Sequence, residues 1–143
     1  MKKAAVVFWS GTGNTELMAD AIIEGIVKAG KEADKMEAAV FGPEALNDYE
    51  VIAFGCPAMG DEVLEESEFE PMFAGLEGNL GGKKVALFGS FGWGDGQWMR
   101  EWCERVSGDG AVLVNEGGLI VNGTPGELEL ADCKDLGKEI AGA

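Results

Sequence analysis

Short hydrophobic runs alternate with segments of helical periodicity along this chain. The runs Lys3–Trp9, Val51–Gly55 and Lys84–Ser90 are almost continuously apolar, which is typical of strands covered on both faces of a sheet. Between these runs, hydrophobic residues recur every three or four positions, and this spacing predicts helices. The positions that predict helices are Met18, Ile22, Ile26 and Ala29; Phe69, Met72, Phe73 and Leu76; Trp98, Met99, Trp102, Cys103 and Val106; and Cys133, Leu136 and Ile140.

Two weaker runs complete the predicted strands. Glu32–Ala38 is weakly hydrophobic, which favours a sheet edge, and Ala111–Asn115 continues into Gly118–Val121 as one interrupted strand. Gly30 is a natural end for the first helix, and Asp95 is a candidate N-cap for the third. Strands that alternate with helices predict an α/β fold, a doubly wound three-layer sandwich with a parallel sheet. The length of 143 residues predicts a single domain over residues 1–143.

Composition and charge exclude several classes of function. The chain carries 26 acidic and 11 basic residues, a net charge of −15, and no histidine. A surface this acidic repels phosphate backbones and anionic lipids, so we expect neither a nucleic-acid nor a membrane partner. The apolar runs are also far shorter than the roughly 20 residues of a membrane span. Without histidine, Ser-His-Asp and Cys-His catalysis and histidine-ligated metals are excluded.

The cysteines indicate a reducing compartment. Cys56, Cys103 and Cys133 are widely spaced, odd in number and form no C-x-x-C pair. This pattern favours reduced thiols that act as small apolar core residues. We therefore expect a cytoplasmic protein.

Three loops follow strands that the pattern places centrally, and ligands of such folds bind beyond the carboxyl ends of the strands. The first loop, Ser10–Thr15, joins a strand to a helix N-terminus and reads Ser-Gly-Thr-Gly-Asn-Thr. Free backbone N–H groups, two glycines and four side-chain donors favour binding of a terminal monophosphate. The loop lacks the lysine of a P-loop, and Glu16 stands where a dinucleotide fingerprint needs its third glycine. A hydroxyl-rich helix cap is the plainer alternative.

The other two loops offer apolar surfaces beside the first. The loop Ser90–Trp98 sets aromatic residues among glycines, and Trp93 is either a lid over the core or a stacking surface for a planar ligand. The loop Cys56–Glu62 offers Met59 as a soft opposite face, although a single methionine is more often a packing residue. Together with the first loop, these features predict a flat aromatic ring attached to a monophosphate.

Three motifs give the chain a recognisable pattern. Trp9–Glu16 (WSGTGNTE), Ala58–Glu62 (AMGDE) and Lys84–Gly96 (KVALFGSFGWGDG) resemble those of short-chain flavodoxins of the clostridial type. The resemblance extends from Lys3 to about Gly137. It implies a flavodoxin-like sandwich whose five-stranded parallel sheet has the order 2-1-3-4-5, with helices on both faces. It also implies non-covalently bound FMN and single-electron transfer between redox proteins, with no substrate turnover of its own.

The resemblance assigns roles to positions in these motifs. The Ser10–Thr15 loop would hold the FMN phosphate, while Met59 and Trp93 would cover the two faces of the flavin ring. The Gly60–Asp61 peptide would contact flavin N5, and Glu62 would accept a hydrogen bond from N3–H. The residues that the resemblance places at FMN are Trp9, Ser10, Gly11, Thr12, Gly13, Asn14, Thr15, Ala58, Met59, Gly60, Asp61, Glu62, Ser90, Phe91, Gly92, Trp93 and Gly94.

Two segments depart from the family pattern. Phe91 stands where the family usually has tyrosine, so a hydroxyl contact is lost there. After the last strand, the family carries asparagine and an acid, whereas this chain reads Asn122–Pro125. The contribution of this last loop to the site is left open by the sequence.

A run of acids begins at the second loop. On its own the run indicates a solvated charged face. Beside an anionic reduced flavin, however, each acid would oppose the negative charge by a few tenths of a kcal/mol. The six together would lower the reduction potential of the flavin by on the order of 50–100 mV. The same charges favour docking of basic patches on reductases and oxidases, and we expect the chain itself to be a monomer. The six acids are Asp61, Glu62, Glu65, Glu66, Glu68 and Glu70.

Two other classes of protein compete with this interpretation. An FMN-dependent oxidoreductase of the quinone or azo reductase type would act on a small substrate, but the sequence shows no nicotinamide-binding segment. A receiver domain would need acids after the first strand and an aspartate after the third, where Trp9-Ser10 and Cys56-Pro57 stand. We favour a low-potential one-electron carrier that binds FMN.

Overall fold

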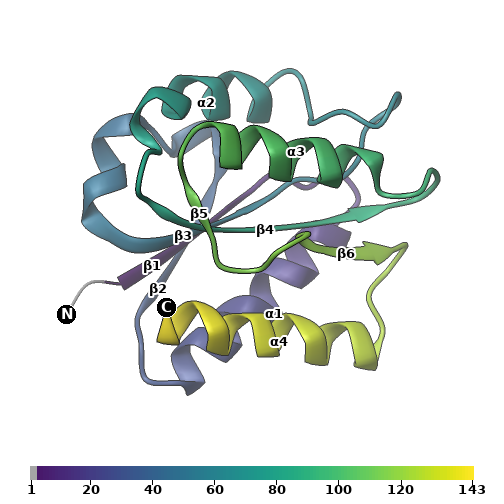
Figure 1. Cartoon of the computed structure of the whole chain (residues 1–143). Coiled ribbons are helices and arrows are strands. Elements are labelled where there is room, and N and C mark those ends of the chain that lie inside the picture. The colour runs from purple at the N-terminus through teal and green to yellow at the C-terminus, as the bar shows by residue number, and fades with distance from the viewer. Residues whose placement is uncertain (1–2) are drawn as a thin grey trace.

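The computed structural model describes residues 3–143, which form one parallel sheet between two layers of helices (Figure 1). None of the helices in these residues combines the length and the apolar composition that crossing a membrane requires. Short 3₁₀ turns cover Ala38–Val40, Pro43–Asp48 and Glu77–Asn79. The elements are β1 (Lys3–Phe8), α1 (Asn14–Lys28), β2 (Ala33–Glu37), β3 (Tyr49–Gly55), α2 (Phe69–Leu76), β4 (Lys84–Phe91), α3 (Gln97–Gly108), β5 (Val112–Leu113), β6 (Leu119–Asn122) and α4 (Glu127–Gly142).

The strands lie in the order β2-β1-β3-β4-β5, all parallel, and β6 pairs with β4 beyond the end of β5. This arrangement confirms the predicted doubly wound sandwich and its strand order. Helices α1 and α4 cover one face of the sheet, and α2 and α3 cover the other (Figure 1). Because the strands run in one direction, β1, β3 and β4 end at the same edge, where the three predicted loops begin.

The core lies on both faces of the central strands, which accounts for their continuous hydrophobic character. On the face covered by α2 and α3, aromatic rings meet edge to face, as for Phe54 and Phe73 with centroids 5.2 Å apart. On the opposite face, α1 and α4 approach so closely that a Cβ atom on Gly25 would lie 2.2 Å from the Lys134 carbonyl oxygen. Glycine is therefore required at this crossing of two helices.

The last strand of the sheet is interrupted, as predicted, and a side chain closes the gap. The Asn115 side chain accepts a hydrogen bond from Leu87 N at 3.1 Å and donates one to Leu87 O at 2.9 Å. This amide thus takes the place of a peptide unit between β5, which pairs with Val85, and β6, which pairs from Phe88 onward. The sheet stays continuous although Glu116 and Gly117 leave its plane in a turn.

One local prediction was wrong. Asp95 does not cap α3, because Gly96 occupies the N-cap position with a φ of 91° in the left-handed region. The Asp95 carboxylate instead accepts a hydrogen bond from Arg100 Nη2 at 3.0 Å. Cys56 and Cys133 are buried thiols as predicted, whereas Cys103 is half-buried at the border of the core.

The Asn115 bridge leads to a stability prediction. Asn115→Ala leaves the Leu87 N–H and C=O without partners, so the free energy of unfolding should fall by about 2 kcal/mol. Urea unfolding followed by circular dichroism measures the change. Asn122→Ala, at an exposed position of β6, is the matched control and should change stability by less than about 0.5 kcal/mol. Equal losses in the two variants would contradict the role of the bridge.

Candidate functional site

A pocket of about 230 Å³ opens at the carboxyl edge of the sheet. All three predicted loops contribute to it, together with a residue from the loop after β6. Most of its lining is apolar, as expected for a site that takes a flat ring. The lining residues are Trp9, Gly11, Thr12, Asn14, Pro57, Ala58, Met59, Ser90, Phe91, Gly92 and Gly123.

The loop between β1 and α1 presents free donors beside this pocket. The Ser10 hydroxyl accepts hydrogen bonds from Gly13 N at 3.1 Å and Glu16 N at 3.3 Å, which folds the loop back on itself. Within residues 3–143, the backbone N–H groups of Gly11, Thr12 and Thr15 have no protein acceptor. These amides lie at the N-terminus of a helix, where an anion is stabilised without a basic side chain.

A buried pair of hydroxyls connects this loop to the end of β4. Thr15 Oγ1 lies 2.9 Å from Ser90 Oγ, and both side chains are buried. Thr15 and Ser90 were each predicted to contact the cofactor, and the structure shows that their hydroxyls contact each other. The first and third loops are thus joined across the end of β3, which lies between β1 and β4.

The second loop is a tight hairpin closed by two backbone hydrogen bonds. Met59 N donates to Val63 O at 2.9 Å, and Val63 N donates to Met59 O at 3.2 Å. The three residues between them turn the chain, with Gly60 at a φ of 23° and Glu62 at 57°. A left-handed glutamate is unusual, and its carboxylate is held by Gln97 N at 3.1 Å at the start of α3. We call the segment Met59–Val63 the flavin-side hairpin, after the position that the sequence motifs predict for it.

The predicted site residues fall into two groups. Nine of the seventeen line the pocket, and the others are their neighbours in the same loops. Trp93 does not line it; its side chain is 64% exposed, between Gly92 and Gly94. The nine that line the pocket are Trp9, Gly11, Thr12, Asn14, Ala58, Met59, Ser90, Phe91 and Gly92.

Two lining residues, Pro57 and Gly123, were not predicted. Gly123 N donates to Phe91 O at 2.8 Å, so the loop after β6 is fastened to the loop that carries the aromatic residues. The signal for Gly123 was its place at the carboxyl end of a strand next to β4. The departure of Asn122–Pro125 from the family pattern therefore lies at the pocket itself.

The run of acids proves to be divided between structural and exposed roles. Glu65 is buried, and its carboxylate accepts hydrogen bonds from Ser67 N, Glu68 N and Phe69 N at 2.8–2.9 Å, which caps the start of α2. Burial alone would raise the pKa of Glu65, but hydrogen bonds from Ser67, Phe69 and Glu68 outweigh it and hold the pKa below its ordinary value. Glu68 accepts a hydrogen bond from Trp9 Nε1 at 2.9 Å. Glu65 is therefore not part of a solvated acidic face, since the start of α2 requires an acceptor.

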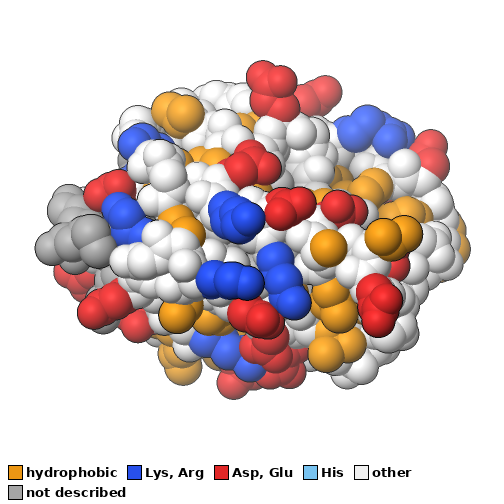
Figure 2. Space-filling model, turned by 90° about the horizontal axis from the view of Figure 1, so that it is seen from below, with side chains coloured by type: hydrophobic (Ala, Val, Ile, Leu, Met, Phe, Trp, Pro, Cys, Tyr) orange, Lys and Arg blue, Asp and Glu red, His pale blue; other side chains and the backbone are white. Residues whose placement is uncertain are grey.

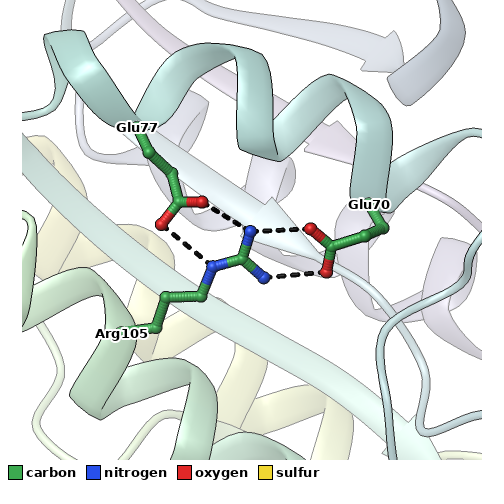
Figure 3. A network of polar contacts seen from close by, with 3 residues as sticks. All are labelled: Glu70, Glu77 and Arg105. Carbon is green, nitrogen blue, oxygen red and sulfur yellow. Dashed lines mark hydrogen bonds and ion pairs between the residues drawn. The ribbon is translucent and has the colours of Figure 1, made fainter.

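A second acid of the run, Glu70, is paired with an arginine. Arg105 on α3 makes two hydrogen bonds to Glu70 and two to Glu77, as Figure 3 shows. These hydrogen bonds hold the pKa of Arg105 above its ordinary value, and the bond from Arg105 holds the pKa of Glu77 below its own. Beside them, burial raises the pKa of Asp109 to about 6, and Glu77 adds to the rise.

The fold and the pocket are those of a doubly wound α/β protein with a candidate ligand pocket at the carboxyl edge of its sheet. The sequence model of the flavodoxin family matches residues 6–135. The flavodoxin of Clostridium beijerinckii is 51% identical over 136 residues, covering 95% of this chain and 97% of that protein. The flavodoxin of Megasphaera elsdenii is 44% identical over 138 residues, covering 96% and 98%. The chain therefore belongs to the flavodoxin family, whose members bind FMN and carry electrons.

The solved structures agree with this assignment. The solution structure of two-electron reduced Megasphaera elsdenii flavodoxin matches with a TM-score of 0.90 and 42% identity, covering 98% of this chain and 99% of that one. Flavodoxins are electron-transfer proteins rather than enzymes, so the alternative of a quinone or azo reductase is not favoured.

The raised pKa of Asp109 leads to a pH-dependent prediction. The pKa of Asp109 is about 6 in the folded chain instead of its ordinary 3.8, so the carboxyl takes up a proton on folding between these pH values. Its contribution lowers the free energy of unfolding as the pH rises from about 4 to 6, and the loss is complete above that range. Asp109→Asn should therefore raise the free energy of unfolding by about 1 kcal/mol at pH 7.5, and by less at pH 5. Denaturant unfolding at both pH values measures this. The exposed Asp132→Asn on α4 removes the same charge, and an equal, pH-independent gain in both variants would refute the assignment.

Proposed function

We propose that this chain carries single electrons at low potential, with FMN bound in the pocket at the carboxyl edge of the sheet. The observation that carries the proposal is the set of free amides of Gly11, Thr12 and Thr15 beside an apolar pocket. Such a site fits a phosphate joined to a planar ring. FMN supplies the electron chemistry, and the protein supplies binding, orientation and electrostatics.

Different residues bind different parts of FMN. The loop Ser10–Thr15 holds the phosphate through its hydroxyls and free amides, without any Lys or Arg in the loop. Met59 lies in the pocket against one face of the ring, and Phe91 and Gly92 border it from the third loop. Trp93 covers the other face, since its side chain is exposed in the same loop and free to lie against a ligand. The Gly60–Asp61 peptide and Glu62 approach the polar edge of the ring from the flavin-side hairpin.

Charge near the hairpin favours a low potential. Asp61 and Glu66 are exposed acids, whereas Glu70 is compensated by Arg105. The positive charge of Arg105 offsets one of the acids that oppose negative charge on the ring, so their summed contribution is on the order of 50 mV. A phosphate held by neutral amides acts in the same direction, because its charge is not cancelled.

The distribution of surface charge supports docking of basic partners at the pocket edge. On the face formed by α1 and α4, lysines and acids are mixed, as Figure 2 shows. Lys28, Lys134 and Lys138 lie there beside Glu24 and Asp135. A basic partner is therefore drawn to the flavin-side hairpin rather than to this face. We propose that the chain does this as a monomer.

Ligand binding tests the proposed function. The FMN-free protein should take up one FMN with the visible absorption of bound flavin, and it should bind riboflavin, which lacks the phosphate, at least about 100-fold more weakly, roughly 2.7 kcal/mol. The loaded protein should accept electrons from a flavodoxin reductase yet oxidise negligible NADPH on its own. Equal affinity for riboflavin and FMN would refute the phosphate loop, and rapid NADPH oxidation would refute the carrier role.

The exposed tryptophan provides a prediction for a single residue. Trp93→Ala removes the stacking surface, so the dissociation constant for FMN should rise at least about tenfold, roughly 1.4 kcal/mol. Quenching of flavin fluorescence on titration with protein measures it. Trp93→Phe keeps an aromatic face and should restore most of the affinity. Unchanged binding by the alanine variant would show that Trp93 does not cover the ring.

A further inference from the structure

Arg105 joins the two helices that carry the second and third loops of the site (Figure 3). Its Nη1 and Nη2 donate to the Glu70 carboxylate at 2.8 and 2.7 Å, and its Nε and Nη2 donate to Glu77 at 2.9 and 2.5 Å. The guanidinium carbon also lies 5.0 Å from the centroid of the Phe73 ring. Glu70, Phe73 and Glu77 lie on successive turns, the first two within α2 and the third directly after it. Among residues 3–143, the ion pairs between this segment and α3 are those of Arg105.

Glu70 is linked to the flavin-side hairpin by a short segment that several hydrogen bonds hold. Glu70 N donates to Glu65 O at 2.8 Å, and the Glu65 carboxylate caps the same helix start. Glu65 N in turn donates to the buried Cys56 Sγ at 3.3 Å, at the beginning of the second loop. Only Leu64 separates Glu65 from Val63, the last residue of the hairpin. These contacts join the start of α2 to the hairpin.

Helix α3 holds the same loop at two further points. Gln97 N, at the first residue of α3, donates to Glu62 Oε1 in the hairpin turn at 3.1 Å. Trp98 Nε1 donates to Cys56 O at 3.2 Å, beneath the loop. The loop and the start of α2 are thus enclosed by contacts to both ends of α3. Arg105 makes the contact at the far end.

We propose that Arg105 is a positioning residue that sets the place of the flavin-side hairpin by holding the start of α2 against α3. Its planar fork is suited to this, because it engages two carboxylates in fixed directions, whereas a lysine offers only a point charge. The hydrogen bonds to Glu70 hold the end of α2 nearest the hairpin, and those to Glu77 hold the far end. The proposal for the hairpin stands on the protein contacts, and its effect on FMN rests on the proposed function.

The two carboxylates bound by Arg105 allow a matched pair of variants. Glu70→Gln and Glu77→Gln each remove one carboxylate and one charge from the same arginine. Hydrogen exchange of the Met59 and Val63 amides, measured with and without FMN, should be at least tenfold faster in Glu70→Gln than in Glu77→Gln. Arg105→Lys keeps the charge and loses the fork, and it should accelerate the same two amides at least tenfold. Lys134→Gln, which removes the ion pair between α4 and α1, is the control and should leave them unchanged.

The outcomes separate positioning from mere stabilisation. Faster exchange at Met59 and Val63 than at Ile22 of α1, with a roughly fivefold weaker affinity for FMN, supports the proposal. Equal acceleration of the hairpin and of Ile22 would show that Arg105 only stabilises the fold and would overturn it. Equal effects of Glu70→Gln and Glu77→Gln would overturn it too, even if Arg105→Lys failed to fold. Failure of the wild-type chain to bind FMN would refute the proposed function and leave the exchange result valid.

Discussion

The sheet is covered on both faces, and this constraint decides where polar chemistry can lie in the molecule. Strands β1, β3 and β4 have no solvated face, so their side chains are apolar along almost their full length. Polar groups that contact a ligand must then lie in the loops after the strands rather than within the strands. Because all three strands are parallel, their carboxyl ends deliver three polar or aromatic loops to one edge. The pocket is a consequence of strand direction as much as of any single residue.

Acidic residues serve two purposes in this chain, and burial distinguishes them. Glu65 is an internal anion whose charge is stabilised by amides at a helix start, and Glu70 and Glu77 are bound by one guanidinium. These carboxylates hold helices in place, and Arg105 balances one of the two charges on Glu70 and Glu77. Exposed acids such as Asp61 and Glu66 face solvent near the hairpin. The net charge of −15 already includes Arg105, so the field on a bound ligand or an approaching partner depends on where the acids lie as well as on this total.

Local patterns were sufficient to predict the strands, the four helices, the interrupted last strand and the three loops of the site. What they missed depends on contacts between distant residues. The Thr15–Ser90 pair spans 75 positions, and Arg105 reaches carboxylates 35 and 28 positions away. The Asp95 cap failed for a different reason, since a glycine one residue later can adopt a backbone conformation that aspartate adopts rarely. Gly123 was not among the predicted residues because its loop departs from the family pattern, and its place at the pocket depends on the pairing of β6 with β4.

The interruption between β5 and β6 has a consequence for how the fold can vary. The Asn115 amide restores the pairing with β4, and Glu116 and Gly117 stand outside the sheet in an exposed turn. Register on either side of the turn is set by the pairing of β5 and β6 with β4. Lengthening an exposed loop costs little, because closure entropy grows only slowly with length. This turn is therefore a position where the chain can accept an insertion, or a new surface element, without disturbing the pocket.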